Sequence, residues 1–218
     1  TLVFTSAFNL NWNHAPVFSD SSKGSYFGYS VAFLKDNYDY TLLIGAPKGV
    51  PNNGDPVFNT QLNLESPGVV HQCRLKNNWE CTFLKIETHG NREDGAYRDS
   101  VYHNKNRSMF GGALAVNDDD KKTVLRHLKR LSCMRPSCHE KGHYLMNGIC
   151  YFHKDPSKRG LTTKNLMPLI NTHYQSGEDT YTHEVIFNYA YGEAGFTVHF
   201  PKNSNDLILG APGVFDWK

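Results

Sequence analysis

Short stretches of alternating hydrophobic and polar residues recur along this chain, separated by glycine, proline and other turn-forming residues. From Tyr26 to Phe33 the residues alternate after a glycine, which predicts a half-buried β-strand. Tyr40 to Ile44 is a run of strand-forming residues that predicts a second, buried strand. Gly45-Ala46-Pro47 ends this strand, because proline cannot donate to a sheet, and its glycine and alanine let a neighbouring backbone or ring approach closely.

Two further strands are predicted at residues 67–75 and 81–86, after a long exposed loop at residues 48–67. A brief alternating stretch near the start, Phe8 to Trp12, is consistent with one more strand. Four antiparallel strands in sequence form a single blade-like sheet, which is too small to be stable alone. The chain is therefore expected to stack this sheet on others like it.

The same landmarks return later in the chain. A glycine beside an aromatic residue recurs, so that Gly28, Gly111 and Gly195 are spaced by 83 and 84 residues. Gly-Ala-Pro recurs at residues 210–212, and the lead-in glycine precedes this motif by 17 residues in the first copy and 15 in the last. Two landmarks in one order at one spacing indicate a repeat protein, with units at about residues 8–95, 96–180 and 181–218.

The second unit departs from this pattern. Its Gly-Ala-Pro motif is expected at Leu128, but residues 124–131 do not contain it. Residues 144–152 are predicted to form the third strand of this unit, and a short basic helix is an alternative for residues 119–131. Two segments are predicted to be polar, loop-like connections: residues 87–108 and 153–180. Residues 121–143 are interpreted as either an insertion or an error in the reading frame. The third unit has two predicted strands.

Composition supports an all-β protein. Aromatic residues make up 13% of the chain, and 18 glycines and 10 prolines are spread along it, which is typical of strands joined by many turns. A formal net charge of +2 with scattered Lys and Arg residues gives no case for nucleic-acid binding. No run of about 18 apolar residues is available to span a membrane. Because the chain starts at Thr1 without Met, we expect it to be a fragment of a longer protein.

Five cysteines allow two kinds of chemistry. Cys73 and Cys81 flank a short span that predicts a hairpin tip, which a disulfide could close. The other three cysteines lie near two histidines in the sequence. Together these five residues could bind zinc in a small module: Cys133, Cys138, His139, His143 and Cys150. This segment contains no Cys-x-x-Cys motif, which is typical of zinc sites. In an oxidising compartment these cysteines would form disulfides instead. Asn106-Arg107-Ser108 is an N-glycosylation acceptor if the chain is secreted.

The Phe-Gly lead-in followed by Gly-Ala-Pro resembles the FG-GAP repeat of integrin α subunits. Further stretches that resemble an integrin α amino terminus cover essentially the whole chain: residues 8–10, 24–31, 42–48, 147–151 and 209–218. The divergent second unit resembles the insect-type α subunits. The resemblance implies an all-β, seven-bladed β-propeller of four-stranded antiparallel blades, of which this chain holds about the first two and a half. It also implies a cell-surface, single-pass type I receptor whose calcium sites lie in later blades, with no cofactor in this segment.

The resemblance also implies a binding hub. In the family, aromatic residues at the propeller hub receive a basic side chain from the integrin β subunit, and the matching positions here are Tyr26, Tyr29 and Phe196. Met109 stands where an aromatic residue is usual. The alternative for each of these residues is ordinary core packing between blades.

Matrix recognition is implied for the loop after the last Gly-Ala-Pro, which contains Phe215, Asp216 and Trp217. Asp216 stands where RGD-binding relatives have an aromatic residue. The ending Asp-Trp-Lys is similar to the Asn-Trp-Lys of laminin-binding α subunits, which favours a laminin-like ligand over an RGD ligand. The alternative is a solvated turn with no binding role.

The disulfides of the family map to Cys73–Cys81 and to Cys133–Cys150, and Cys138 has no counterpart. Residues 117–120 lack the glycine and closing carboxylate of a calcium loop and are predicted to form a turn.

An enzyme is a rival class of function. No Gly-x-Ser-x-Gly, His-Glu-x-x-His or phosphate-binding loop is present. One FG-GAP relative, a hydrolase of the glycosylphosphatidylinositol phospholipase D type, is an enzyme, but it would need a metal-binding catalytic domain upstream. The sequence therefore predicts a non-catalytic, extracellular adhesion-receptor subunit that pairs with an integrin β subunit and binds extracellular matrix.

Overall fold

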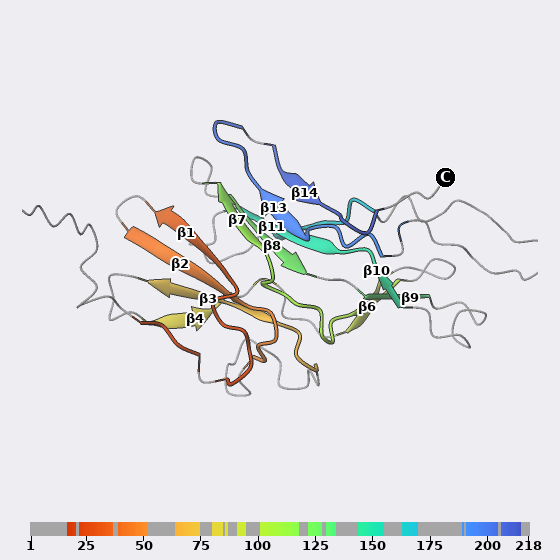
Figure 1. Cartoon of the computed structure of the whole chain (residues 1–218), viewed down its shortest axis with the longest axis horizontal. Helices are drawn as coiled ribbons and strands as arrows, with labels where there is room; N and C mark the ends of the chain where they lie inside the picture. The colour runs from red at the N-terminus through yellow and green to blue at the C-terminus, as the bar shows by residue number, and fades with distance from the viewer. Residues whose placement is uncertain are drawn as a thin grey trace, which may run out of the picture.

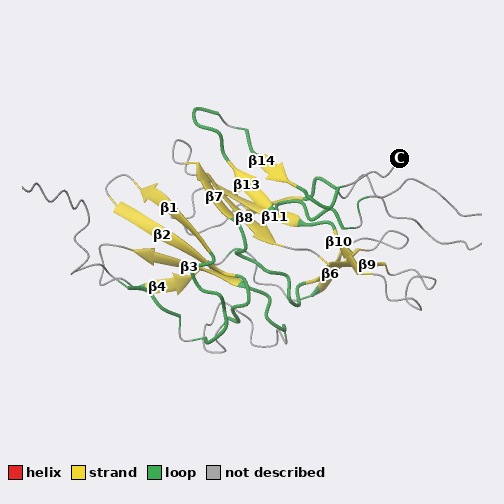
Figure 2. Ribbon diagram, in the orientation of Figure 1, coloured by secondary structure: helices red, strands yellow, loops and turns green. Residues whose placement is uncertain are grey.

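The protein is all-β, as predicted, and the described residues contain no helix (Figures 1 and 2). The computed structural model describes residues 17–20, 22–36, 39–51, 64–74, 80–84, 86, 91–94, 101–117, 122–127, 130–133, 144–154, 163–169, 189, 191–204 and 206–214. Its strands are β1 (Ser30–Asp36), β2 (Asp39–Ala46), β3 (Val69–Arg74), β4 (Cys81–Phe83), β5 (Arg92–Asp94), β6 (Val101–Asn104), β7 (Leu114–Asn117), β8 (Lys122–His127), β9 (Arg130–Cys133), β10 (Tyr144–Met146), β11 (Ile149–Lys154), β12 (Thr163–Leu166), β13 (Thr197–His199) and β14 (Ile208–Gly210).

The first blade is the antiparallel sheet β1-β2-β3-β4, with neighbouring strands in sequence order. All four strands were predicted, although β1 begins only at Ser30 because the residues before it form a turn. Alternation along β2 places Leu42 and Ile44 on one face and Leu43 on the other, and all three are buried. Both faces of this blade are therefore partly covered.

The second blade is the sheet β7-β8-β11-β12. Strand β8 takes the place of the strand that ends in Gly-Ala-Pro elsewhere, and it ends at His127 beside the expected position of the missing motif. The alternative of a basic helix at residues 119–131 is wrong, because β8 and β9 occupy the described part of that segment. Strand β12 lies within a predicted polar connection, so that prediction was also wrong.

An accessory sheet, β10-β9-β6-β5, is built from two insertions. Strands β5 and β6 precede the second blade in a segment predicted to be loop-like, and β9 and β10 interrupt the blade between β8 and β11. The single strand predicted at residues 144–152 is therefore two strands in different sheets, separated at Asn147-Gly148. The insertions are attached at the end of the second blade where β7 begins, because β7 runs antiparallel to β8 and β8 to β11.

The third unit contributes the antiparallel pair β13 and β14, the two strands that were predicted. Strand β13 contacts β7, and β7 contacts β1, so the first strands of the three units lie side by side. Blades one and two share a core in which Leu43 and Val70 pack with Ile149 and Tyr151. Blades two and three share a second core that contains Cys150, Phe152, Leu166, Phe200 and Leu209. Stacked sheets with gathered first strands are the arrangement of a β-propeller, here a partial one.

Glycines before the third strands let neighbouring blades touch. Gly68 and Gly148 precede β3 and β11, with φ of +86° and +84°. A Cβ atom would lie 2.3 Å from the carbonyl oxygen of Phe110 at Gly68, and 2.1 Å from that of Ala194 at Gly148. Only glycine combines this backbone conformation with so close an approach. The two positions are equivalent joints between successive blades.

Candidate partner-binding site at the starts of the blades

Each unit begins with the same turn, directly before its first strand. The backbone N–H at the fourth residue donates to the carbonyl at the first, and the two lie 3.0 Å apart in all three units: Tyr29 to Tyr26, Gly112 to Met109, and Phe196 to Glu193. The first residue has a positive φ each time, 56°, 55° and 51° for Tyr26, Met109 and Glu193. The third residue is the lead-in glycine, with φ between +84° and +89°. We call these three segments the hub turns.

In the first and third units, the Gly-Ala-Pro motif holds the hub turn in place through a backbone hydrogen bond. The lead-in glycine donates its N–H to the carbonyl of the motif glycine, Gly28 to Gly45 at 3.1 Å and Gly195 to Gly210 at 3.0 Å. A Cβ atom on Gly45 would lie 2.0 Å from the carbonyl oxygen of Gly111 in the next blade. The close backbone approach that the motif predicts is therefore present, and it joins the first two hub turns.

The three aromatic residues predicted for the hub all lie on hub turns. Tyr26, Tyr29 and Phe196 are 55%, 62% and 49% exposed, so each presents part of its ring to solvent. In the second unit, the equivalents of Tyr26 and Tyr29 are Met109 and Gly112, so that unit offers no aromatic ring at these positions. The aromatic surface is thus contributed by the first and third units.

A charged residue that the sequence prediction missed lies beside this surface. The ammonium of Lys48 lies over the ring of Tyr26, 4.6 Å from its centroid. Lys48 follows Gly-Ala-Pro, and its N–H donates to the carbonyl of Ser25 at 3.0 Å, which holds the end of β2 against the hub turn. An aromatic face attracts a cation, so this pair is a cation–π contact within one blade.

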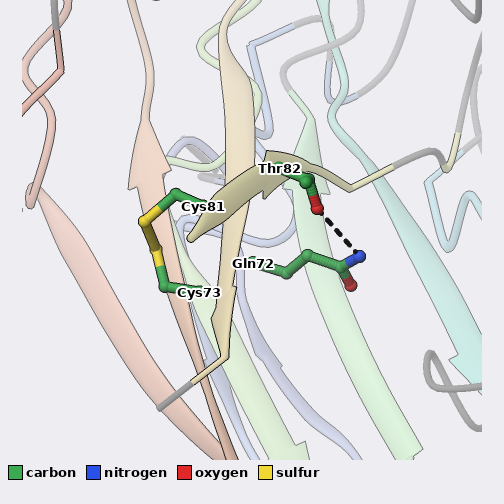
Figure 3. The surroundings of a disulfide bond; sticks show 4 residues. All are labelled: Gln72, Cys73, Cys81 and Thr82. Atoms are coloured by element: carbon green, nitrogen blue, oxygen red, sulfur yellow. Dashed lines mark hydrogen bonds between the residues drawn. A yellow bond between two sulfur atoms is a disulfide. The ribbon is translucent and has the colours of Figure 1, made fainter. Parts of the chain in front are cut away.

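The predicted Cys73–Cys81 disulfide is present and joins directly opposed residues of β3 and β4. Figure 3 shows it next to a second link between the same strands, a hydrogen bond of 3.2 Å from Gln72 Nε2 to Thr82 Oγ1. Cys150 is buried on β11, while Cys133 lies on β9 in a different sheet. The side chain of Cys133 lies outside the described part, so the Cys133–Cys150 disulfide stays a prediction.

The glycosylation acceptor lies at the joint between blades one and two. Asn106 Oδ1 accepts a hydrogen bond of 2.9 Å from the N–H of Glu65, and the buried hydroxyl of Ser108 donates to the carbonyl of Pro67 at 2.8 Å. Arg107 forms an exposed ion pair with Glu65. The hydrogen bond from its guanidinium to Glu65, together with the charge of that carboxylate, raises the pKa of Arg107.

His71 is a buried titratable residue on the face of the first blade turned away from the second. Its ring lies between Phe27 and Phe83, with centroids 5.0 and 4.8 Å away, and its Nε2 has no hydrogen-bond partner. Burial lowers the pKa of His71, and the negative charge of Asp20 opposes this effect. Its place in a predicted strand was the only sign of this residue in the sequence analysis.

Several predicted site residues lie outside the described residues, namely Phe215, Asp216, Trp217, Cys138, His139 and His143. Within the described ranges, no group of three or more His, Cys, Asp or Glu side chains is arranged to hold a metal ion. Those ranges likewise contain no helix of the length and hydrophobicity needed to cross a membrane.

Stacked antiparallel blades whose first strands gather beneath equivalent turns define the class as a β-propeller, and curated relatives of this chain are integrin α subunits. No family model matches the chain. Integrin alpha-V of Gallus gallus is 28% identical over 217 residues, which is 97% of this chain. Integrin alpha-5 of Xenopus laevis is 28% identical over 224 residues, covering 100% of it, and integrin alpha-PS3 of Drosophila melanogaster is 21% identical over 208 residues, covering 94%.

These relatives confirm the predicted resemblance to integrin α subunits, which are adhesion receptors and not enzymes. Both insect and vertebrate subunits match, so the resemblance to the insect type stays a prediction. The chain spans only 17 to 19% of the length of these three relatives.

Proposed function

We propose that this chain is the amino-terminal part of a cell-surface adhesion receptor subunit, which pairs with an integrin β subunit through its hub turns. The proposal is supported by similarity to integrin α subunits over at least 94% of the chain. The observation that carries it is the repeated hub turn, which presents Tyr26 and Tyr29 in the first unit and Phe196, the equivalent of Tyr29, in the third. Exposed aromatic rings on a rigid backbone suit the capture of a cation.

The rigidity of the turns matters for this function. Each exposed ring is attached to a backbone fixed by a hydrogen bond within the turn, and in the first and third units also by the Gly-Ala-Pro glycine. A preorganised surface loses little conformational entropy when a partner binds, so more of the contact energy contributes to affinity. A Lys or Arg side chain of the β subunit would be the cation.

Pairing is tested by co-expressing the full-length chain with each β subunit of the same species and isolating the complex from the cell surface. We expect a stable heterodimer with at least one β subunit, and replacement of Phe196 by Ala should reduce its yield. The matched control is Val17→Ala, at an exposed apolar residue that belongs to none of the hub turns. Absence of a heterodimer with every β subunit would disprove the proposal.

For the matrix ligand, we propose recognition of a laminin-like protein by the loop that contains Asp216. The accessory sheet supports a recognition surface on this side, because its insertions are attached at the end of the second blade that carries the hub turn. Cells expressing the receptor are expected to adhere to laminin more strongly than to an RGD peptide surface, and Asp216→Ala should reduce this adhesion. Equal adhesion to both surfaces would contradict the preference. In this proposal calcium binds later blades and no cofactor binds this segment.

We also propose that Asn106 carries an N-linked glycan. Its Oδ1 is held by the N–H of Glu65, which fixes the side chain at an exposed joint. Enzymatic removal of N-glycans should shift the mass of the secreted chain, and Asn106→Gln should remove one glycan from that shift. An unchanged glycan count in this variant would show that the acceptor is not used.

A further inference from the structure

The N-glycosylation acceptor also forms the joint that holds blade two against blade one. Asn106 Oδ1 accepts a hydrogen bond from the N–H of Glu65 at 2.9 Å, and the N–H of Arg107 donates to the carbonyl of Glu65 at 2.7 Å. Ser108 Oγ donates to the carbonyl of Pro67 at 2.8 Å. All three residues of the acceptor are therefore bonded to one short segment, which lies directly before β3.

In the folded chain this acceptor is closed to the enzyme that would modify it. The glycan transferase recognises the asparagine amide together with the hydroxyl two residues later, which is why only Ser or Thr serves at that position. Here the hydroxyl belongs to Ser108, which is 0% exposed and already donates to Pro67. Arg107, between the two groups, has a φ of +52°, a left-handed conformation that a flexible peptide rarely adopts. The folded acceptor thus offers neither an accessible hydroxyl nor the backbone of a flexible peptide.

A glycan that is attached beforehand is compatible with the same joint. Attachment substitutes the nitrogen of the Asn106 amide, whereas the hydrogen bond from Glu65 uses Oδ1, which remains an acceptor afterwards. Asn106 is half-buried and its neighbour Arg107 is exposed, so the attachment point lies at the surface. The joint can therefore close around a glycan that is already present.

The order of synthesis leaves an interval in which the acceptor is open. The ring of Phe110, two residues beyond the acceptor, packs edge-on against the ring of Tyr151 on β11, with centroids 5.9 Å apart. Tyr151 follows Ser108 by 43 residues. At about 5–20 residues per second, β11 is made on the order of seconds after the acceptor. Until β11 is present, the core beneath the joint is incomplete.

We infer that Asn106 is glycosylated only before blade two docks on blade one, and that closure of the joint then ends its reactivity. This inference rests on the proposed glycan and deepens it, because it makes the fold control when the site is used. A chain that misses the interval keeps an unmodified Asn106 once the receptor has folded. An exposed acceptor elsewhere on the same chain has no such limit.

The test uses the full-length chain paired with its β subunit, made under partial inhibition of glycan synthesis so that part of the folded receptor lacks the Asn106 glycan. This receptor is incubated with the purified transferase and a lipid-linked oligosaccharide, and mass spectrometry follows the modification of Asn106. The control acceptor is Asn203, an exposed residue of the β13–β14 loop that Asn205→Thr converts into a glycosylation site. We expect Asn106 to be modified at least ten-fold more slowly than Asn203.

Opening the joint should restore the reaction. Gly68→Ala adds a Cβ atom 2.3 Å from the carbonyl oxygen of Phe110, and it should raise the modification rate of Asn106 in the folded receptor at least five-fold. The matched control is Gly24→Ala, which also places alanine at a positive φ but has nothing within 4 Å of the added Cβ, and it should react as slowly as wild type. If the Gly68→Ala chain does not pair, Glu65→Ala takes its place; it removes an exposed ion pair of the joint, so we expect a rise of only about two-fold.

The outcomes separate this inference from the proposed glycan. Modification of Asn106 in the folded wild-type chain as fast as that of Asn203 would overturn the inference and leave the glycan in place. Equally slow reaction of the opened variant and the Gly24→Ala chain would also overturn it, because the joint would then not be what closes the site. If uninhibited cells leave Asn106 unmodified but the opened variant is modified, the proposed glycan fails and closure by the joint stands. If neither is modified, both fail.

Discussion

Tyr26, Met109 and Glu193 share a positive φ although their side chains are aromatic, thioether and carboxylate. For a residue with a Cβ atom this conformation costs about 1 kcal/mol or more, so the backbone conformation favours none of these three residue types. The repeat imposes the conformation through the turn hydrogen bond and the lead-in glycine, and the side chain is then left to vary between units. The hub turns are thus a constant frame that presents different chemistry in each blade.

The joint glycines give a direct test of how blades pack. Gly148→Ala should destabilise the protein by roughly 3 kcal/mol or more, because it adds both a left-handed alanine and a Cβ atom 2.1 Å from the Ala194 carbonyl oxygen. Gly24→Ala is the matched control: Gly24 has φ of +79° but nothing within 4 Å of the added Cβ. It should cost only about 1 kcal/mol. Thermal unfolding of the full-length ectodomain measures both, and equal losses would show that packing at the joint contributes nothing.

His71 predicts a pH dependence of stability. Because burial lowers its pKa in the folded state, the unfolded chain binds more protons at this residue as the pH falls below about 6.5. The stability contributed by neutral His71 is fully present above that pH and is lost as the pH falls toward the lower folded pKa. His71→Phe keeps a ring between Phe27 and Phe83 and removes the titration. The variant should lose less stability than wild type between pH 7.5 and 5; identical pH profiles would contradict this.

At the scale of elements, β3 and β4 are joined by two links of unequal value. The Cys73–Cys81 disulfide closes a loop with a sequence separation of 8, which corresponds to roughly 2–3 kcal/mol of stabilisation. Replacing both cysteines by serine should therefore cost about that much in unfolding free energy. The neighbouring variant Thr82→Val removes only an exposed hydrogen bond and should cost about 0.5 kcal/mol or less. A similar loss for both variants in denaturant unfolding would refute this ranking.

Runs of strand-forming residues bounded by glycine, proline, asparagine or aspartate were predictable, as the four strands of the first blade and the pair β13–β14 show. The second blade was not, because residues 144–152 look like one strand in the sequence, whereas Asn147-Gly148 separates two strands of different sheets. Strands β5, β9 and β12 are short and mostly polar, so no hydrophobic alternation reveals them, and β9 also pairs with β6, which is distant in sequence. Lys48 was missed for a similar reason, since only the folded chain brings it over Tyr26.

At the scale of the whole molecule, the stacked blades leave apolar side chains exposed on both outer faces. Val31, Phe33 and Tyr40 are exposed on the face of the first blade turned away from the second, and Ile208 is exposed on β14. Contiguous exposed apolar surface promotes association. We therefore propose that further blades of the same protein cover these faces.

This proposal predicts that residues 1–218 produced alone will self-associate and will not unfold cooperatively as a monomer. Light scattering after size-exclusion chromatography measures the association. Phe33→Ser should increase the monomer fraction of the isolated segment, yet it should reduce secretion of the full-length chain, where we expect Phe33 to be covered. Lys35→Ser, at an exposed position on the same strand, is the matched control. A monomeric, cooperatively unfolding segment would argue against missing blades.

The accessory sheet has a consequence for how such chains diverge. Its central strands, β6 and β9, come from two insertions that interrupt the repeat at different places, and each insertion supplies one edge strand. Loss of either insertion would leave the other as two strands with an open edge, which is marginally stable in water. The two insertions must therefore be gained, lengthened and lost together in evolution. A chimaera that transplants this region into another propeller has to carry residues 92–104 and 130–146 as one unit.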